Sequence, residues 1–137
     1  DPETQAILMR LDSDLAEAML ATAERRLDSV RLRWSADPAV CVVMASKGYP
    51  GAYGKGDPIA GLEDAAAAGA VVFHAGTAAK DGRLVTAGGR VLGVTARGPT
   101  LRQARDTAYA AVDRIHWRGA FCRRDIAHRA LARQATP

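Results

Sequence analysis

Cysteine is scarce in this sequence, which contains only Cys41 and Cys122. Cys41 lies inside an apolar run and Cys122 stands beside arginines, so the two do not form the close pairs typical of a zinc site. Nor do they indicate the disulfide framework of a small secreted domain. Both features favour a reducing compartment, and we expect a cytoplasmic protein.

Long hydrophobic runs are missing as well. Apolar stretches such as residues 40–44 are far shorter than the roughly 20 residues that cross a bilayer. The acidic N-terminus has a helical pattern and lacks the profile of a signal peptide. We therefore expect no membrane partner.

Charge of one sign is not segregated along most of the chain. The sequence has 19 Lys and Arg against 15 Asp and Glu, a formal net charge of +4, and only the C-terminal stretch is locally basic. Aromatic residues make up 5% of the chain and form no array on which bases could stack. These features weigh against a nucleic-acid partner, and we expect none.

What the sequence does have is enough apolar material for one core. It is 137 residues long, 48% hydrophobic and 25% charged, which is typical of a single globular domain. It begins at Asp1 rather than at a methionine, and its first residues resemble the middle of a longer chain. We therefore expect a fragment.

Helical periodicity covers residues 2–27 and predicts either one broken helix or two adjoining helices. Asp1 is the expected cap, Pro2 suits the first helical position, and Glu3 suits the positive end of the helix dipole. A second cap is expected within residues 12–14. The pattern does not decide between the two alternatives.

The period changes to two after residue 29. Residues 30–34 alternate like a half-buried strand, and residues 40–45 are apolar on both faces like a central one, with a turn at 35–38 between them. Glycines then crowd into residues 48–56, a density that predicts a loop.

Three further strands are expected at residues 70–75, 83–87 and 90–96. Reversal signals at 80–82 and 88–89 separate them, and together they predict an antiparallel meander.

The clearest helix begins at Thr100, which forms an expected capping box with Gln103. Its apolar stripe should lie on the sheet. Residues 123–133 are expected to form a short arginine-rich helix, and the tail 134–137 is expected to fray. The fold class that follows is α+β, with a mixed, largely antiparallel sheet packed with helices.

The loop after the central strand is the first candidate for ligand binding, because ligands commonly lie at strand ends. Backbone amides around Gly48 could hold an anion with the charge of Lys47. The order Gly-x-x-x-x-Gly-Lys-Ser/Thr of a P-loop is absent, so phosphate binding would need another geometry. The alternative is a structural turn without a ligand.

A second candidate is the turn of Gly88 and Gly89, which is followed by Arg90. The guanidinium of Arg90 could present its fork of donors to a phosphate or a carboxylate. A tight turn of two glycines, however, needs no function to explain it.

His74 ends an apolar strand, where hydrogen bonds to neighbouring residues are the commoner role of a histidine. The cluster of Arg123, Arg124 and Asp125 could bind phosphate or an RNA backbone, or could be a solvated face with local ion pairs. No spacing in the chain predicts a metal site or a nucleophile–base pair. We expect no catalytic residue and no metal ligand in this segment.

In their order, these blocks resemble the glycinamide ribonucleotide synthetases. The similarity begins with Asp1-Pro2-Glu3-Thr4-Gln5, which resembles the end of that family's Arg-x-Gly-Asp-Pro-Glu-x-Gln signature, and it runs to about residue 131. The later blocks that carry it are Ala45-Ser46-Lys47-Gly48-Tyr49-Pro50-Gly51, Lys55-Gly56-Asp57, Phe73-His74-Ala75-Gly76-Thr77, Gly88-Gly89-Arg90-Val91-Leu92 and Arg123-Arg124-Asp125-Ile126.

The resemblance implies a role in an ATP-grasp ligase of purine biosynthesis. Enzymes of this family join glycine to 5-phosphoribosylamine, using ATP and Mg²⁺ (or Mn²⁺). The family's nucleotide clamp and metal ligands lie upstream of this segment, so the implied role here is to position substrate beside the N-terminal and ATP-grasp domains of the same enzyme. The implied substrate-binding residues are Lys47, Gly48, Tyr49, Gly88, Gly89 and Arg90, followed by Asp1, Glu3, His74 and Arg124.

The resemblance also implies two parts, with residues 1–28 as the helical end of the ATP-grasp module and residues 29–137 as the C-terminal α+β domain. We expect Lys47 and Arg90 to face one shared hollow, because both substrates are anionic. The alternatives are the C-terminal domain of another ATP-grasp ligase, or a free-standing module that binds anions or RNA through the basic tail.

Overall fold

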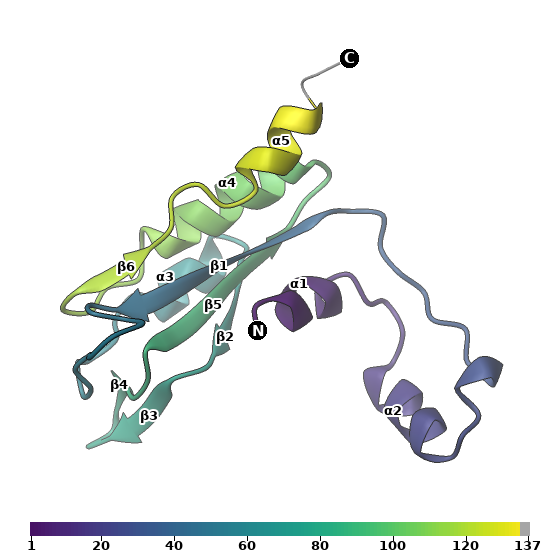
Figure 1. The fold of residues 1–137 in the computed structure, drawn as a ribbon, viewed down its shortest axis with the longest axis horizontal. Helices are drawn as coiled ribbons and strands as arrows, with labels where there is room; N and C mark the ends of the chain where they lie inside the picture. Colours follow the sequence, from purple (N-terminus) through teal and green to yellow (C-terminus); the bar gives the residue numbers. More distant parts are fainter. Residues whose placement is uncertain (135–137) are drawn as a thin grey trace.

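A computed structural model describes residues 1–134. Its main body is a four-stranded antiparallel sheet in the order β2-β5-β1-β6, with α3 and α4 on one face and α1 on the other (Figure 1). This confirms the predicted α+β class. The strands of this sheet are β1 (Ala39–Ser46), β2 (Val71–His74), β5 (Arg90–Arg97) and β6 (Ala120–Cys122), and the helices are α1 (Glu3–Leu8), α2 (Leu15–Ala23), α3 (Leu62–Ala67), α4 (Leu101–Val112) and α5 (His128–Gln134).

Strand β1 is central, as its apolar run predicts. It pairs with β5 along its whole length and with β6 at its carboxyl end, where Ser46 lies opposite Ala120. Val42 and Met44 are buried in the main hydrophobic core, beneath α4. The end of β1 is therefore held on both sides, which gives the loop after it a fixed starting point.

Strand β5 contains a bulge near its start. Met44 lies opposite Leu92 but Ala45 lies opposite Arg90, so Val91 is an extra residue in the ladder. Val91 and Leu92 are both buried, at 0% and 1% exposure. A bulge of this kind interrupts the two-residue alternation and re-aims the side chains before it. Arg90 consequently lies on the face that carries α1.

Helix α4 begins as predicted. The Thr100 hydroxyl accepts a hydrogen bond from the Gln103 backbone N–H at 3.2 Å and lies 3.0 Å from Gln103 Oε1. The predicted apolar stripe packs on β1 and β5. Its fully or nearly fully buried members are Ala104, Ala108, Ala111 and Val112.

The predicted meander is wrong in its pairing. Strand β4 (Arg83–Thr86) pairs with β3 (Thr77–Lys80), a strand that the sequence pattern did not predict, and the two form a separate ribbon. Asp81 and Gly82 close this hairpin with φ values of 50° and 72°, the left-handed geometry of a two-residue turn. Strand β5 pairs with β2 instead, so Gly88 and Gly89 connect two sheets.

The first 38 residues, the N-terminal arm, contain two helices separated at residues 9–14. Asp1 does not cap α1, whose start has no side-chain cap, and pairs with Arg90 instead. Asp14 caps α2 by accepting hydrogen bonds from the N–H groups of Ala16 and Glu17. The second of the two alternatives, two helices with a new cap, is the one observed.

The strand predicted at residues 30–34 does not form. The segment follows a short 3₁₀ helix, η1 (Leu27–Ser29), and forms a single isolated β-bridge, between Trp34 and Leu11, with hydrogen bonds of Arg33 to Asp12 and Ser13 beside it. An alternating pattern makes a strand only where another strand is available to pair with it, and here α2, η1 and this segment project away from the sheet (Figure 1).

The arm also exposes apolar side chains. Seven of the ten large exposed hydrophobic residues in the part of the chain that the structure describes lie between residues 7 and 34. Helix α2 packs mainly against η1 and buries only two alanines. The seven exposed residues are Ile7, Leu15, Met19, Leu20, Leu27, Leu32 and Trp34.

The C-terminal helix begins later than residue 123. The Tyr109 hydroxyl donates to the Arg123 carbonyl at 2.7 Å and accepts from the Ile126 N–H at 3.1 Å, which holds the segment before the helix on α4. Of the tail 134–137 that we expected to fray, Gln134 is the last residue of α5, and residues 135–137 lie outside the described residues. Between residues 1 and 134, no helix is both long and apolar enough to cross a membrane.

Candidate functional site

The loop after β1 turns sharply at Gly48. Its φ is +98°, and a Cβ at this position would lie 2.0 Å from the Ala52 carbonyl oxygen, so only glycine fits. The Tyr49 N–H donates to the Ser46 carbonyl at 3.1 Å and closes the turn. The side chains of Tyr49 and Tyr53 lie together, with ring centroids 6.4 Å apart.

This loop meets the second glycine turn. The Ser46 N–H donates to the Gly89 carbonyl at 2.8 Å, and the Ser46 hydroxyl donates to the Gly88 carbonyl at 3.0 Å. The ring of Tyr49 lies so close to Gly89 that a Cβ there would be 2.3 Å from the ring. The two glycine-rich segments, 40 residues apart in sequence, therefore form one structural unit at the same end of β1 and β5.

Gly88 also supports its neighbours from the other side. A Cβ on Gly88 would lie 2.8 Å from the Cα of Gly76, which explains why two glycines face each other here. The Ala87 N–H donates to the Gly76 carbonyl at 2.7 Å, and the Gly76 N–H donates to the Arg90 carbonyl at 3.0 Å. The backbone before and after the turn is thus fixed, and with it the starting position of Arg90.

Arg90 pairs with the first residue of the chain. Its Nε lies 3.2 Å from Asp1 Oδ1, and both side chains are partly exposed. A small hollow beside the pair is lined by Gln5, whose Oε1 is buried and has no hydrogen-bond partner among the described residues. Glu3, the first residue of α1, is exposed. Of the predicted site residues, Asp1 and Arg90 are thus brought into direct contact.

Lys47 lies in a different hollow. A space of about 320 Å³ opens at the end of β1, and its wall includes Lys47, Asp57, Arg118 and Gly119. Arg90 does not line this hollow. The expectation that Lys47 and Arg90 face one shared hollow is therefore wrong for this chain, because the bulge at Val91 places Arg90 on the α1 face while Lys47 extends toward the β6 side.

Arg118 is the residue that sequence reasoning missed. Its Nη2 lies 2.9 Å from Asp57 Oδ1, and its side chain is 89% exposed while that of Asp57 is 17% exposed. The Lys55-Gly56-Asp57 block carries part of the family resemblance, but its pattern does not predict a contact between Asp57 and residue 118. Only the pairing of β1 with β6 brings Arg118 beside Lys47.

His74 ends β2 and is exposed, with Nδ1 3.2 Å from the Thr77 hydroxyl. This hydrogen bond spans the turn between β2 and β3, which agrees with the role of a histidine held by its neighbours. In the register of the sheet it lies opposite Leu92, two residues beyond Arg90. His74 is therefore near the glycine turns without contacting the charged residues of either hollow.

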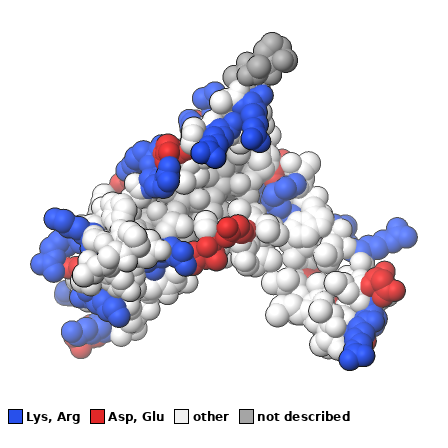
Figure 2. Space-filling view, viewed as in Figure 1, with Lys and Arg blue, Asp and Glu red and all other residues white. Residues whose placement is uncertain are grey.

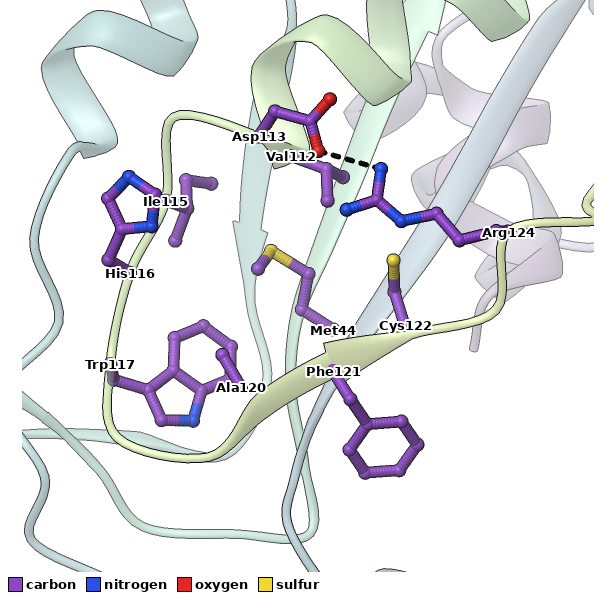
Figure 3. Close-up of a pocket in the computed structure, with 10 residues that line it drawn as sticks. All are labelled: Met44, Val112, Asp113, Ile115, His116, Trp117, Ala120, Phe121, Cys122 and Arg124. Carbon is purple, nitrogen blue, oxygen red and sulfur yellow. Dashed lines mark ion pairs between the residues drawn. The ribbon is translucent and has the colours of Figure 1, made fainter.

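Arg124 stands at a third hollow, of about 240 Å³, between α4 and β6 (Figure 3). It pairs with Asp113 at 2.6 Å on the rim, and its guanidinium lies 5.6 Å from the ring centroid of Tyr109. Met44 and Trp117 form the apolar floor beneath this pair (Figure 3). The structure does not bring Arg124 to the glycine turns, and its contacts hold the C-terminal segment on α4.

The neighbouring arginine forms a forked ion pair. Arg123 Nε and Nη2 donate to the two carboxylate oxygens of Asp125 at 2.9 and 2.6 Å. These hydrogen bonds lower the pKa of Asp125 from 3.8 to about 2. Burial raises the pKa of the Cys122 thiol in the same region. The basic cluster is thus engaged in local ion pairs, the second of the two alternatives that its sequence allowed.

Figure 2 shows acidic side chains gathered at the N-terminal end of α1, with basic side chains beside them and a larger basic group at the far end of the sheet, around the β3–β4 ribbon. Among residues 1–134, no three His, Cys, Asp or Glu side chains come together as a metal ion would require.

Comparison with known proteins gives consistent matches. The family model described as phosphoribosylglycinamide synthetase, C domain, matches residues 39–129. The chain is 54% identical to the phosphoribosylamine–glycine ligase of Agrobacterium fabrum, over 98% of this chain and 31% of that protein. It is also 54% identical to the chloroplastic phosphoribosylamine–glycine ligase of Arabidopsis thaliana, over 96% of this chain and 25% of that protein.

A solved structure agrees with these sequences. The crystal structure of the phosphoribosylamine–glycine ligase of Thermotoga maritima superposes with a TM-score of 0.70 at 36% identity, covering 91% of this chain and 30% of that one. The chain thus spans less than a third of the length of these relatives.

Proposed function

The chain belongs to the phosphoribosylglycinamide synthetase family, and on that premise we propose that it is the C-terminal part of an ATP-dependent ligase that joins glycine to 5-phosphoribosylamine in purine biosynthesis. The product of this reaction is glycinamide ribonucleotide. The match to the family's C domain and the high identity to phosphoribosylamine–glycine ligases support this proposal over another ATP-grasp ligase or a free-standing module that binds RNA.

The role of this segment is to position substrate at one wall of the active-site cleft. The observation that carries this role is the meeting of the two glycine turns, which fixes Lys47 and Arg90 at the same end of the sheet. Both substrates carry anionic groups, a phosphate on one and a carboxylate on the other. Cations held on a rigid backbone can orient such groups without reorganising during the reaction.

The two cations contact different parts of the bound phosphoribosylamine, because they line different hollows. Lys47 lines the more open of the two hollows, while Arg90 lines the narrower one and forms an ion pair with Asp1. The supporting residues that we propose for substrate binding are Gly48, Tyr49, Gly88, Gly89, Asp1, Glu3, His74 and Arg124. Among these, Gly48 and Gly89 act by allowing the close approach of Ala52 and Tyr49.

ATP and Mg²⁺ (or Mn²⁺) are the cofactors that this reaction requires. The described residues gather no set of carboxylates that fits a magnesium ion, and no P-loop is present. We therefore assign the metal and the nucleotide phosphates mainly to parts of the longer ligase outside this chain.

The N-terminal arm is the proposed contact with the rest of the ligase. Its exposed apolar side chains, such as Met19 at 65% and Leu20 at 51%, would be covered if α2 packed against the ATP-grasp domain. The division into residues 1–28 and 29–137 remains our proposal for the domain boundary, and the family match begins somewhat later, at residue 39. We also propose that the enzyme acts in the cytoplasm.

Kinetics of the full-length ligase test the function. Lys47→Ala and Arg90→Ala are each expected to raise the KM for phosphoribosylamine by about tenfold, since each removes a hydrogen bond to a charged group. The KM for ATP should change little. Arg102→Ala, at an exposed position on α4, is the matched control for loss of a positive charge. Unchanged phosphoribosylamine kinetics in both variants would refute the assignment.

A further inference from the structure

Three segments that are distant in sequence meet at the Lys47 hollow. Lys47 extends from the end of β1, Gly54 and Asp57 come from the glycine-rich loop, and Arg118 and Gly119 precede β6. Gly119 has a φ of +78°, and a Cβ there would lie 2.8 Å from the Cβ of Lys47. The stem of the lysine therefore rests on the glycine, which fixes its direction beside Arg118.

Asp57 is held more firmly than a loop residue usually is. Its N–H donates to the Thr86 hydroxyl at 3.1 Å, and its carbonyl accepts from the Thr86 N–H at 2.9 Å. The Gly56 N–H donates to the Thr86 carbonyl at 2.7 Å. The glycine-rich loop thus runs along β4, and the carboxylate of Asp57 stands at a set position in the wall of the hollow.

The ion pair with Asp57 orients Arg118 but engages only one of its hydrogen-bond donors. A guanidinium has five N–H donors, and only one is engaged with the Asp57 carboxylate, at 2.9 Å. Because the Arg118 side chain is 89% exposed, its remaining donors are open to solvent beside the ammonium of Lys47. A fork of donors next to a point charge suits an anion with several oxygen atoms.

We propose that this hollow binds the phosphate monoester of the sugar-phosphate substrate, with Arg118 as the second cation beside Lys47 and Asp57 as the residue that orients it. The proposal rests on the function proposed above and separates the phosphate site from Arg90. The volume of the Lys47 hollow, about 320 Å³, accommodates a phosphate and the adjoining carbon atoms. The two cations oppose one carboxylate in the wall, so a net positive charge remains for the dianion.

The surroundings strengthen the attraction. Lys55 lies between Gly54, which lines this hollow, and Gly56, which lines the neighbouring one together with Lys80, Asp81 and Arg83, so the group keeps a net positive charge. Figure 2 shows basic side chains, with a few acidic ones among them, at the end of the molecule that carries the β3–β4 ribbon. Clustered charge of one sign raises the rate at which an anionic ligand arrives. The hollow therefore lies within a positive field that extends beyond its own two cations.

Binding of ribose 5-phosphate to the full-length ligase tests the proposal, with ribose as the probe that lacks the phosphate. Arg118→Gln should weaken ribose 5-phosphate binding, measured by calorimetry, about tenfold. Asp57→Asn should weaken binding less, by about two- to fivefold, because both cations remain but Arg118 loses the carboxylate that orients it. Ribose binding should be the same in all proteins.

Arg102→Gln is the control for loss of one positive charge away from the hollow, and it should bind ribose 5-phosphate like the unaltered enzyme. Thermal melting checks folding, which Arg118→Gln should not affect because the side chain is exposed. If the enzyme forms glycinamide ribonucleotide but Arg118→Gln binds ribose 5-phosphate normally, the site is wrong and the function stands. Tighter binding by Asp57→Asn would overturn the orienting role of Asp57. An unaltered enzyme without ligase activity would instead refute the function.

Discussion

The N-terminal arm and the sheet domain, residues 39–134, differ in how far they bury their large apolar side chains. The sheet domain encloses a core between β1, β5 and α4, in which Val42, Val94 and Ala108 have no exposed surface. The arm leaves most of its large apolar side chains in solvent and buries only alanines in α2. The sheet domain has its own hydrophobic core, whereas the arm has the exposed apolar surface of a segment that packs against another part of a longer protein.

The difference also separates the kinds of residue that the two regions contribute to the proposed site. The sheet domain supplies rigid positions, since both glycine turns are tied to strands by backbone hydrogen bonds. The arm supplies Asp1, whose position depends on α1 lying on the sheet. Geometry at Lys47 is therefore set within the sheet domain, whereas geometry at Arg90 depends on both regions.

The largest effect is expected from a substitution in the core. Leu92→Ala should lower the free energy of unfolding by roughly 2–5 kcal/mol, because Leu92 is 1% exposed and its loss leaves a cavity. Leu20→Ala in the arm, at 51% exposure, should cost less than about 0.5 kcal/mol in this chain. Urea unfolding of both variants measures the contrast, and equal losses would show that the arm shares the core's cooperativity.

A smaller effect should appear in the arm only when the rest of the ligase is present. Met19→Ser is expected to destabilise the full-length enzyme by roughly 1–2 kcal/mol, because Met19 would be buried there. In the 137-residue chain the same change should have no measurable effect, since the side chain is 65% exposed. Thermal melting of the two proteins, each with and without the substitution, tests this. Equal behaviour in both lengths would contradict the docking of α2.

Helix caps sharpen the comparison further. Thr100→Ala removes the cap of α4 and should reduce global stability by about 1 kcal/mol. Asp14→Ala removes the cap of α2 and should weaken that helix without moving the unfolding midpoint of the sheet domain. Amide hydrogen exchange distinguishes the two outcomes, because only α2 amides should exchange faster in Asp14→Ala. Faster exchange throughout the core would mean that α2 supports it.

The smallest effect concerns a surface ion pair at the C-terminal end of the sheet domain. The pKa of Asp125 is lowered to about 2, so its pairing with Arg123 contributes stability above pH 3.8 and loses it as the pH falls toward 2. In Arg123→Gln the pKa of Asp125 should return toward 3.8, as followed by NMR of the carboxyl carbon. Because the pair is exposed, the unfolding midpoint at neutral pH should stay the same. A pKa that remains near 2 would assign the shift to another group.

Strong local patterns predicted much of the sheet domain. The apolar run of β1 and the capped stripe of α4 each indicated one element with one buried face, and both form as expected. The false strand at 30–34 shows the limit, because alternation without a partner is not enough. Strand β3 was missed because Thr77–Lys80 contains two alanines and a lysine, which carry little strand preference.

For the candidate site, the sequence predicted the two glycine turns of the backbone but not the positions of the charged side chains. The density of glycines indicated the two turns, since close approaches need residues without a Cβ, and the structure brings these turns together. Which hollow each cation lines depends on strand register, which the sequence pattern of β5 does not reveal. The partnership of Lys47 with Arg118 depends on the pairing of β1 with the three-residue strand β6, too short to carry a signal.

The extra residue Val91 divides β5 into two segments that tolerate insertions and deletions differently. From Leu92 to Ala96, the residues are paired in register with β1 and buried on both faces of the sheet, so inserting or deleting one residue there would exchange the side chains of the two buried faces. Ahead of Val91, the same change would only lengthen or shorten the approach to the glycine turn. The strand can therefore alter how it presents Arg90 while its packing stays intact, and related ligases could adjust this contact independently of their stability.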